Sequence, residues 1–253
     1  MPLCATSQGK VHYEIQGSGP PLALLHADGS SGLEFEPVLA RLQERFSVLV
    51  PDLPGCGRSP RRAFSIEYYE ENAKAVLDLL KKTHQDAARV IGVGGGGVVG
   101  LWMAILAPAR IQAVVADSLA EFYDEEDARR DLAAHQNPSP EMVAFFQDMN
   151  GEDWRTVIQE LDRLFSQMAE EKRSVFDWRL DEVRSPVLLT GSRQDHLISS
   201  SGRRLLEVAE QLPTARLILY PSGGHPAMWS NAESFWRDAL AFVDAPPAAT
   251  PSP

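Results

Sequence analysis

Short apolar segments alternate with longer segments of helical periodicity along the first half of the chain. Residues 22–26 (LALLH) and 90–93 (VIGV) have the length and composition of buried strands, whereas residues 66–82 place apolar side chains on one helical face. The predicted strands are residues 10–16, 22–26, 47–50, 90–93 and 111–116, and the predicted helices are residues 33–46, 66–82 and 98–107. Strands that alternate with helices indicate a parallel sheet covered by helices on both faces.

The alternation stops between residues 119 and 180. This segment is acidic, rich in helix-forming residues and free of strand-like runs, and Asn-Pro-Ser-Pro at 137–140 predicts a turn between helices. Residues 154–168 predict an amphipathic helix. We therefore expect a helical lid inserted into the sheet domain.

Strand-like runs return after residue 180. The predicted elements of this part are strands at 186–190 and 217–220 and helices at 202–211 and 231–243. The expected α/β core therefore comprises residues 1–118 and 181–245, and the lid comprises residues 119–180. Residues 246–253 are rich in Pro, Ala and Ser and predict a disordered tail.

Composition narrows the classes of partner. The 253 residues carry a net charge of −11, with 35 acidic and 24 basic side chains, which disfavours nucleic acid and anionic membranes as partners. The two cysteines match neither a disulfide framework nor a metal site. No signal-peptide pattern or membrane-spanning run is present, so a cytoplasmic protein is predicted. We expect a small molecule as substrate or ligand, and no metal or cofactor. A homodimer stays open.

A run of glycines joins the strand at 90–93 to the next helix. Two interpretations compete for Gly92 to Gly97. A phosphate-binding loop would need the G-x-G-x-x-G pattern, which Gly92, Gly94 and Gly97 satisfy, but four consecutive glycines match many patterns and this turn does not follow the first strand. The other interpretation is the sharp strand-to-helix turn, G-x-S-x-G, that presents a catalytic nucleophile.

Several segments in the same order favour the second interpretation. They are LLHADG at 24–29, DLPGCGRS at 52–59, the glycine turn at 92–97, PARI at 108–111, GSRQD at 191–195 and GH at 224–225. Together they resemble the α/β-hydrolase superfamily, in its esterase- and lipase-like form, over residues 8–245 with a divergent lid. The resemblance implies an α/β-hydrolase fold: a mostly parallel sheet with helices on both faces and an inserted helical lid.

The resemblance also implies catalytic roles. His225 would act as the general base and acid, oriented by Asp195, while Asp117 is a second candidate for the acid. The nucleophile position would fall on Gly94, which has no side chain, and no serine lies between residues 83 and 118 to replace it. A covalent intermediate at residue 94 is therefore excluded.

The loop after the strand at 22–26 would complete the site. The backbone N–H groups of Gly95 and Asp28, with Ala27 as the alternative to Asp28, would form an oxyanion hole. The Asp28 side chain has two interpretations: a helix cap, or a carboxylate near the pocket that repels an oxyanion and attracts a cationic substrate. The expected pocket residues are His26, Trp154, Phe165 and Trp178. A structural role explains His26 as well, and helix packing explains the aromatic residues.

Three functions are compatible with these residues. In the first, the chain has hydrolase ancestry, with a small apolar ester or related acyl compound as substrate, and Gly94 replaces the serine. In the second, His225 and Asp195 catalyse acid–base chemistry without a covalent intermediate, as hydroxynitrile lyases and cofactor-free dioxygenases of the superfamily do. In the third, the lidded pocket binds a small ligand without turnover. Acyl hydrolysis is favoured, although a fold alone does not assign function.

Overall fold

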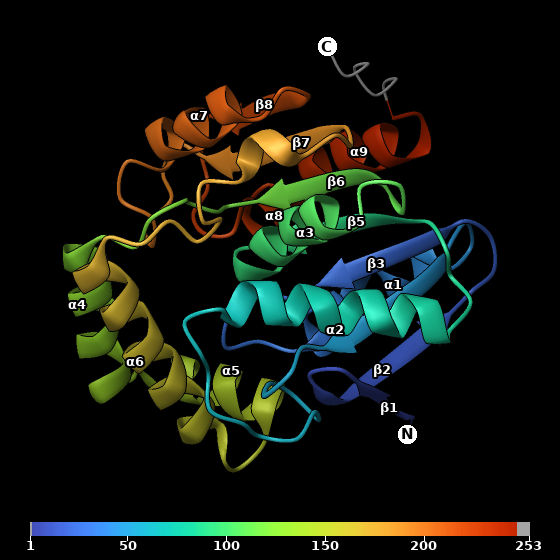
Figure 1. The fold of residues 1–253 in the computed structure, drawn as a ribbon. Coiled ribbons are helices and arrows are strands. Elements are labelled where there is room, and N and C mark those ends of the chain that lie inside the picture. Colours follow the sequence, from blue (N-terminus) through green and yellow to red (C-terminus); the bar gives the residue numbers. More distant parts are fainter. Residues whose placement is uncertain (1, 247–253) are drawn as a thin grey trace.

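The computed structural model describes residues 2–246, which form an eight-stranded sheet with helices on both faces and a separate helical layer (Figure 1). The predicted disordered tail lies almost entirely outside the described residues. The strands are β1 Leu3–Thr6, β2 Gly9–Gln16, β3 Pro21–Leu25, β4 Ser47–Asp52, β5 Ala88–Val93, β6 Ile111–Asp117, β7 Val187–Ser192 and β8 Ala215–Tyr220. Their order across the sheet is β1-β2-β4-β3-β5-β6-β7-β8.

Strand direction divides the sheet into two parts. From β4 to β8 all neighbours are parallel, whereas β1 pairs with β2, and β2 with β4, in antiparallel register. The parallel strands are buried on both faces, which explains their nearly continuous apolar runs. Strand β1 was not predicted, because its LCAT sequence is short and its side chains are exposed or half-buried.

Helices cover both faces of the sheet. The core helices are α1 Glu36–Leu42, α2 Tyr68–Lys82, α3 Gly95–Leu106, α7 Ser201–Gln211, α8 Ala227–Ser230 and α9 Ala232–Asp244. Apolar side chains of α2, α3 and α7 share one core cluster with one face of the sheet, and those of α1, α8 and α9 share a second cluster with the other face. The predicted α/β architecture is confirmed.

Helices α4 Glu125–Gln136, α5 Pro140–Asn150 and α6 Trp154–Glu171 form the insertion. They lie together beyond the ends of the parallel strands (Figure 1). The buried face of α6 carries Val157, Ile158, Leu161 and Leu164, which belong to the same apolar cluster as α2 and α3. The lid is therefore packed onto the core by the hydrophobic effect rather than tethered as a separate unit.

Residues 2–246 contain no helix that is both long and apolar enough to cross a membrane. The same residues contain no group of three or more His, Cys, Asp and Glu side chains placed to hold a metal ion. Cys4 and Cys56 are both free thiols.

Candidate active site

Loops that follow the parallel strands meet at their carboxyl edge, where ligands bind in open α/β sheets. The loop after β3 approaches the turn after β5, since a Cβ placed on Gly94 would lie 3.7 Å from the Cβ of Ala27. The end of β6 meets the segment after β8, where Asp117 Oδ2 accepts the backbone N–H of Met228 at 2.9 Å. Segments far apart in sequence therefore assemble one site.

His225 and Asp195, from the loops after β8 and β7, form a hydrogen-bonded pair. His225 Nδ1 lies 2.9 Å from Asp195 Oδ2, and the other carboxylate oxygen accepts the backbone N–H groups of Leu197 and Ile198. The Asp195 side chain is fully buried, whereas 14% of the His225 side chain is exposed. The pairing through Nδ1 turns Nε2 of His225 away from Asp195, the geometry a general base requires.

Charges around His225 favour its protonated form. Burial lowers the pKa of His225, but the hydrogen bond and charge of Asp195, with the charges of Asp117 and Glu34, outweigh burial and raise it above its usual value. Burial raises the pKa of Asp195, but His225 and the two backbone N–H donors outweigh that effect and lower it. The pair therefore favours a carboxylate facing an imidazolium.

The turn between β5 and α3 is shaped by close backbone contacts. A Cβ on Gly92 would lie 2.2 Å from the carbonyl oxygen of Gly96, and a Cβ on Gly96 would lie 2.1 Å from that of Leu25, so only glycine fits at either position. Gly94 differs, because a Cβ there would meet nothing closer than Ala27. Its backbone has φ 52° and ψ −122°, in the left-handed half of φ space, and it caps α3.

Asp28 directs its carboxylate at the start of α3. A Cβ on Gly95 would lie 2.2 Å from Asp28 Oδ1, and the Gly95 N–H acts to lower the pKa of the carboxyl group. The hydroxyl groups of Tyr69 and Tyr123 donate to Asp28 Oδ2, at 3.0 and 3.4 Å. Burial raises the pKa of Asp28 to about 6, even though these donors and the charge of His225 act to lower it.

The structure corrects two expectations for the loop after β3. His26 is completely buried, with Nδ1 donating to the carbonyl of Ala27 and Nε2 accepting the N–H of Leu53, so its ring supports the loop and does not line a pocket. The Ala27 N–H donates to the carboxylate of Glu34 at 2.9 Å and is therefore taken. Of the two alternatives for the second oxyanion donor, only the Asp28 N–H stays a prediction.

The aromatic residues predicted for the pocket lie in three different settings. Phe165 stacks on Tyr123, with ring centroids 4.2 Å apart, and the Tyr123 hydroxyl group in turn contacts Asp28. Trp154 is 3% exposed and packs inside the lid. Trp178 is 69% exposed and its ring lies near that of Phe122, so its assignment to the pocket stays a prediction.

Asp117, the second candidate for the acid, has hydrogen-bond partners other than His225. Its carboxylate accepts the hydroxyl of Thr190 at 2.7 Å and the N–H of Met228 at 2.9 Å. Burial raises the pKa of Asp117 to about 6. Asp117 thus joins β6 to β7 and α8, while Asp195 is the acid in contact with His225.

A buried asparagine joins the lid to these loops. Asn150, at the end of α5, donates from Nδ2 to the carbonyl of Gly29 at 2.7 Å and accepts the N–H of Gly57 through Oδ1 at 2.8 Å. The guanidinium of Arg61 donates to the Asn150 carbonyl and to Asp153. The loops after β3 and β4 are thereby fixed to the lid by one side chain.

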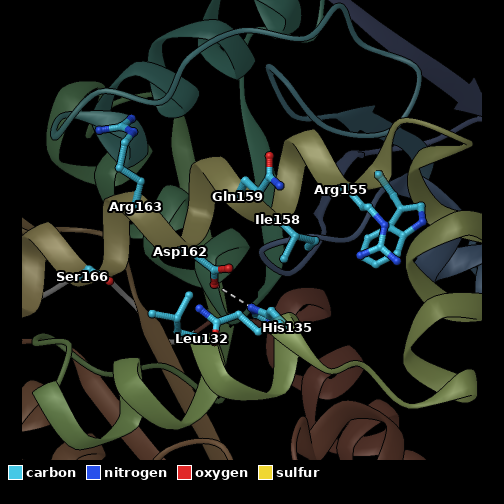
Figure 2. A pocket seen from close by; sticks show the side chains of 10 residues that line it. Leu132, His135, Arg155, Ile158, Gln159, Asp162, Arg163 and Ser166 are labelled. Carbon is cyan, nitrogen blue, oxygen red and sulfur yellow. Dashed lines mark hydrogen bonds and ion pairs between the residues drawn. The ribbon is translucent and has the colours of Figure 1, made fainter.

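A cavity of about 510 Å³ lies between α4 and α6 (Figure 2). His135 and Asp162 form a hydrogen-bonded pair in its lining, with Nδ1 and Oδ1 2.6 Å apart. Its lining residues are Leu132, His135, Gln136, Trp154, Arg155, Ile158, Gln159, Asp162, Arg163 and Ser166. Neither His225 nor Gly94 lines this cavity, so it is separate from the loops of the site.

Sequence analysis missed the tyrosines and the asparagine of this site. Tyr69 belongs to a predicted helix and Tyr123 to the predicted lid, and neither stands in a motif. One signal was present: a tyrosine buried in a helix needs a partner for its hydroxyl group. That partner is Asp28, which lies 41 positions from Tyr69 and 95 positions from Tyr123 in the sequence.

Known proteins were compared with the chain. The model of the alpha/beta hydrolase family matches residues 22–239. A pimeloyl-[acyl-carrier protein] methyl ester esterase from Nitrosomonas europaea is 24% identical, with 89% of this chain and 96% of that protein aligned. Similar solved structures include a hydrolase from Pseudomonas aeruginosa, with TM-score 0.77 and 21% identity, where 96% of this chain and 98% of that chain are aligned. An enol-lactonase from Burkholderia xenovorans has TM-score 0.77 and 17% identity, with 96% of this chain and 100% of that chain aligned.

These solved structures share the fold. The family match spans the strands and loops that carry Asp28, Gly94, Asp195 and His225. The chain belongs to the alpha/beta hydrolase family.

Proposed function

We propose that this protein hydrolyses a small apolar ester or a related acyl compound without a covalent serine intermediate. In this proposal His225, oriented by Asp195, activates water beside Gly94. The observation that carries it is the 2.9 Å contact between His225 Nδ1 and Asp195 Oδ2, placed at the same strand edge as the Gly94 turn. The esterase and hydrolase relatives support acyl chemistry.

Position 94 would be the nucleophile position of the family's strand-to-helix turn. Gly94 keeps a positive φ of 52°, although the space around it would accommodate a Cβ at an ordinary contact distance. Close packing therefore explains the glycines at 92 and 96 but not the glycine at 94. A water molecule beside Gly94 would stand where a serine hydroxyl group would otherwise attack.

The reaction then needs one base and one site for negative charge. His225 Nε2 takes a proton from water, and the resulting hydroxide adds to the acyl carbon. Negative charge develops on the carbonyl oxygen, which the Gly95 N–H would stabilise. General base catalysis of this type supplies about 10²–10⁴-fold in rate.

The test compares His225→Ala with the parent protein on p-nitrophenyl esters of short fatty acids. We expect a loss of about 10²–10⁴-fold in kcat/KM for His225→Ala, and linear progress curves without an initial burst for the parent. An unchanged rate in His225→Ala would overturn the proposal. Binding of the ester without hydrolysis would favour a non-catalytic binding protein.

A fluorophosphonate probe tests the assignment of position 94. Gly94→Ser should be labelled, because the hydroxyl would lie in the space beside Ala27 with His225 at the same edge. Gly94→Ala is the matched control: it fills the same space without a nucleophile, so it should not be labelled and should hydrolyse ester more slowly than the parent. A serine at 94 that resists labelling would contradict the assignment.

A further inference from the structure

The carboxylate of Asp28 lies where the substrate oxygen of the proposed reaction would be stabilised. Its Oδ1 and Oδ2 stand 2.2 and 2.4 Å from the ideal Cβ position of Gly95, and the Gly95 N–H acts to lower its pKa. That N–H is the donor expected to hold the carbonyl oxygen during acyl transfer. The Asp28 carboxylate therefore lies next to Gly95, whose N–H is the expected oxyanion donor.

Two tyrosines hold this carboxylate in position. Tyr69 Oη lies 3.0 Å and Tyr123 Oη 3.4 Å from Asp28 Oδ2, and the two hydroxyl oxygens lie 2.5 Å apart. Tyr69 comes from α2 and Tyr123 from the segment that leads into the lid. The arrangement joins core and lid through one carboxyl group, and burial raises the pKa of both tyrosines well above their usual value, so both stay protonated donors.

The remaining titratable groups around Asp28 are Tyr68, Cys56 and His225. Burial raises the pKa of the Cys56 thiol to about 12 and that of Tyr68 well above its usual value, so both are neutral near pH 7. His225 is the one group among these whose charge changes near neutrality, and its positive charge lowers the pKa of Asp28. The protonation of Asp28 is therefore set mainly by its burial, its hydrogen-bond donors and His225.

We propose that Asp28 is a further catalytic residue, whose protonated carboxyl group donates a hydrogen bond to the substrate carbonyl oxygen beside the Gly95 N–H and then gives its proton to the oxygen of the leaving alcohol. This role rests on the proposed hydrolysis. An ionised Asp28 would repel the negative charge that develops there, because like charges in contact disfavour each other. A buried carboxylic acid that stays protonated can instead act as a donor to an oxyanion.

The proton balance of the reaction closes with two groups. His225 takes one proton from water as the hydroxide adds to the acyl carbon, and Asp28 gives its proton to the oxygen of the leaving alcohol as the ester C–O bond breaks. The products are the carboxylic acid and the alcohol. The proton on His225 then returns to Asp28 through solvent, which restores the starting state.

The proposal predicts a specific pH profile. Activity needs neutral His225 and protonated Asp28. The rate therefore rises with pH at low pH as His225 loses its proton, and it falls at high pH as the protonated fraction of Asp28 decreases. The falling limb should approach about tenfold per pH unit, as expected for loss of one proton. In Asp28→Asn the neutral amide cannot ionise, so the falling limb should disappear and the rate should stay level at alkaline pH.

Tyr69→Phe provides a second variant that retains the acid. Because the Tyr69 hydroxyl lowers the pKa of Asp28, its removal raises that pKa and should move the falling limb to higher pH. Tyr68→Phe is the matched control, since the neighbouring Tyr68 hydroxyl faces Cys56 at 3.7 Å and should leave the limb in place. A falling limb that persists in Asp28→Asn, or that moves equally in both tyrosine variants, would overturn the proposal.

Binding of hexanoate tests the same carboxyl group without turnover. Calorimetry in buffers of different ionisation enthalpy measures the protons taken up on binding. The parent should take up about one proton more than Asp28→Asn at pH 7.5, because an anion can share the Gly95 N–H only with protonated Asp28. Equal uptake would overturn the role of Asp28. A difference in uptake together with intact ester would instead contradict the proposed hydrolysis and leave the donor role of Asp28 in place.

Discussion

The strand-edge loops and the lid hold the site by different kinds of contact. Around Gly94 the backbones of β3, β5 and α3 approach so closely that Gly92 and Gly96 admit no Cβ. In the lid, by contrast, α5 and α6 are held by side chains, through the apolar face of α6 and the amide of Asn150. Backbone contacts therefore determine the shape of the turn at Gly94, and side-chain contacts attach the lid.

Substitution of Trp154 should have the largest effect on stability and tests whether the lid is integral to the core. Trp154 is 3% exposed and stacks on Phe146, so Trp154→Ala should lower the free energy of unfolding by about 3–5 kcal/mol in urea denaturation. Trp178→Ala is the control. Its side chain is 69% exposed, so a change within about 0.5 kcal/mol is expected. Equal costs would show that burial does not distinguish the two lid residues.

Gly96→Ala tests the strand-edge side of the comparison. The added Cβ would lie 2.1 Å from a backbone carbonyl oxygen, and backbone cannot move aside as a flexible side chain can, so a loss of about 3 kcal/mol is expected in the free energy of unfolding. Gly94→Ala should cost only about 1–2 kcal/mol, from its positive φ alone. If Gly94→Ala proves the costlier change, steric contact does not control this turn.

Asp117→Asn sharpens the comparison through pH. The pKa of Asp117 is raised to about 6 in the folded protein, so the folded state binds more protons than the unfolded state between about pH 4 and pH 6, and stability falls across that window as pH rises. The contribution is about 2–3 kcal/mol. Urea unfolding at pH 4 and pH 7 should show a smaller decrease for Asp117→Asn. An unchanged decrease would assign it to other groups.

Asn150→Ala should have the smallest effect of the four and tests the polar link between the two regions. It leaves the carbonyl of Gly29 and the N–H of Gly57 without their partner, at a cost of about 2 kcal/mol in the free energy of unfolding. Hydrogen exchange should report faster opening of the Gly57 amide, whose N–H Asn150 Oδ1 accepts. Met149→Ala, one residue away, should leave the Gly57 amide slow to exchange, and matching acceleration would contradict the role of the Asn150 amide.

Local sequence patterns predicted most of the elements but not all of them. Strands β3 and β5 and helices α2 and α6 have periodicities and apolar runs strong enough to be recognised without tertiary context. The strand β1 and the four-residue helix α8 escaped prediction. Both are short, and each is stabilised by partners elsewhere in the chain rather than by its own pattern.

Site residues divide in the same way. The sequence by itself determined that residue 94 has no side chain, that a helical segment interrupts the alternation of strands and helices, and that His225 and Asp195 are candidates for a pair, because these statements depend on residue identity and order. Tertiary structure alone decided that the Asp28 carboxylate contacts Gly95 and accepts a hydrogen bond from Tyr69, and that Trp178 faces solvent. Hydrophobic periodicity is a property of neighbouring residues, whereas the partner of a polar side chain depends on how distant segments pack.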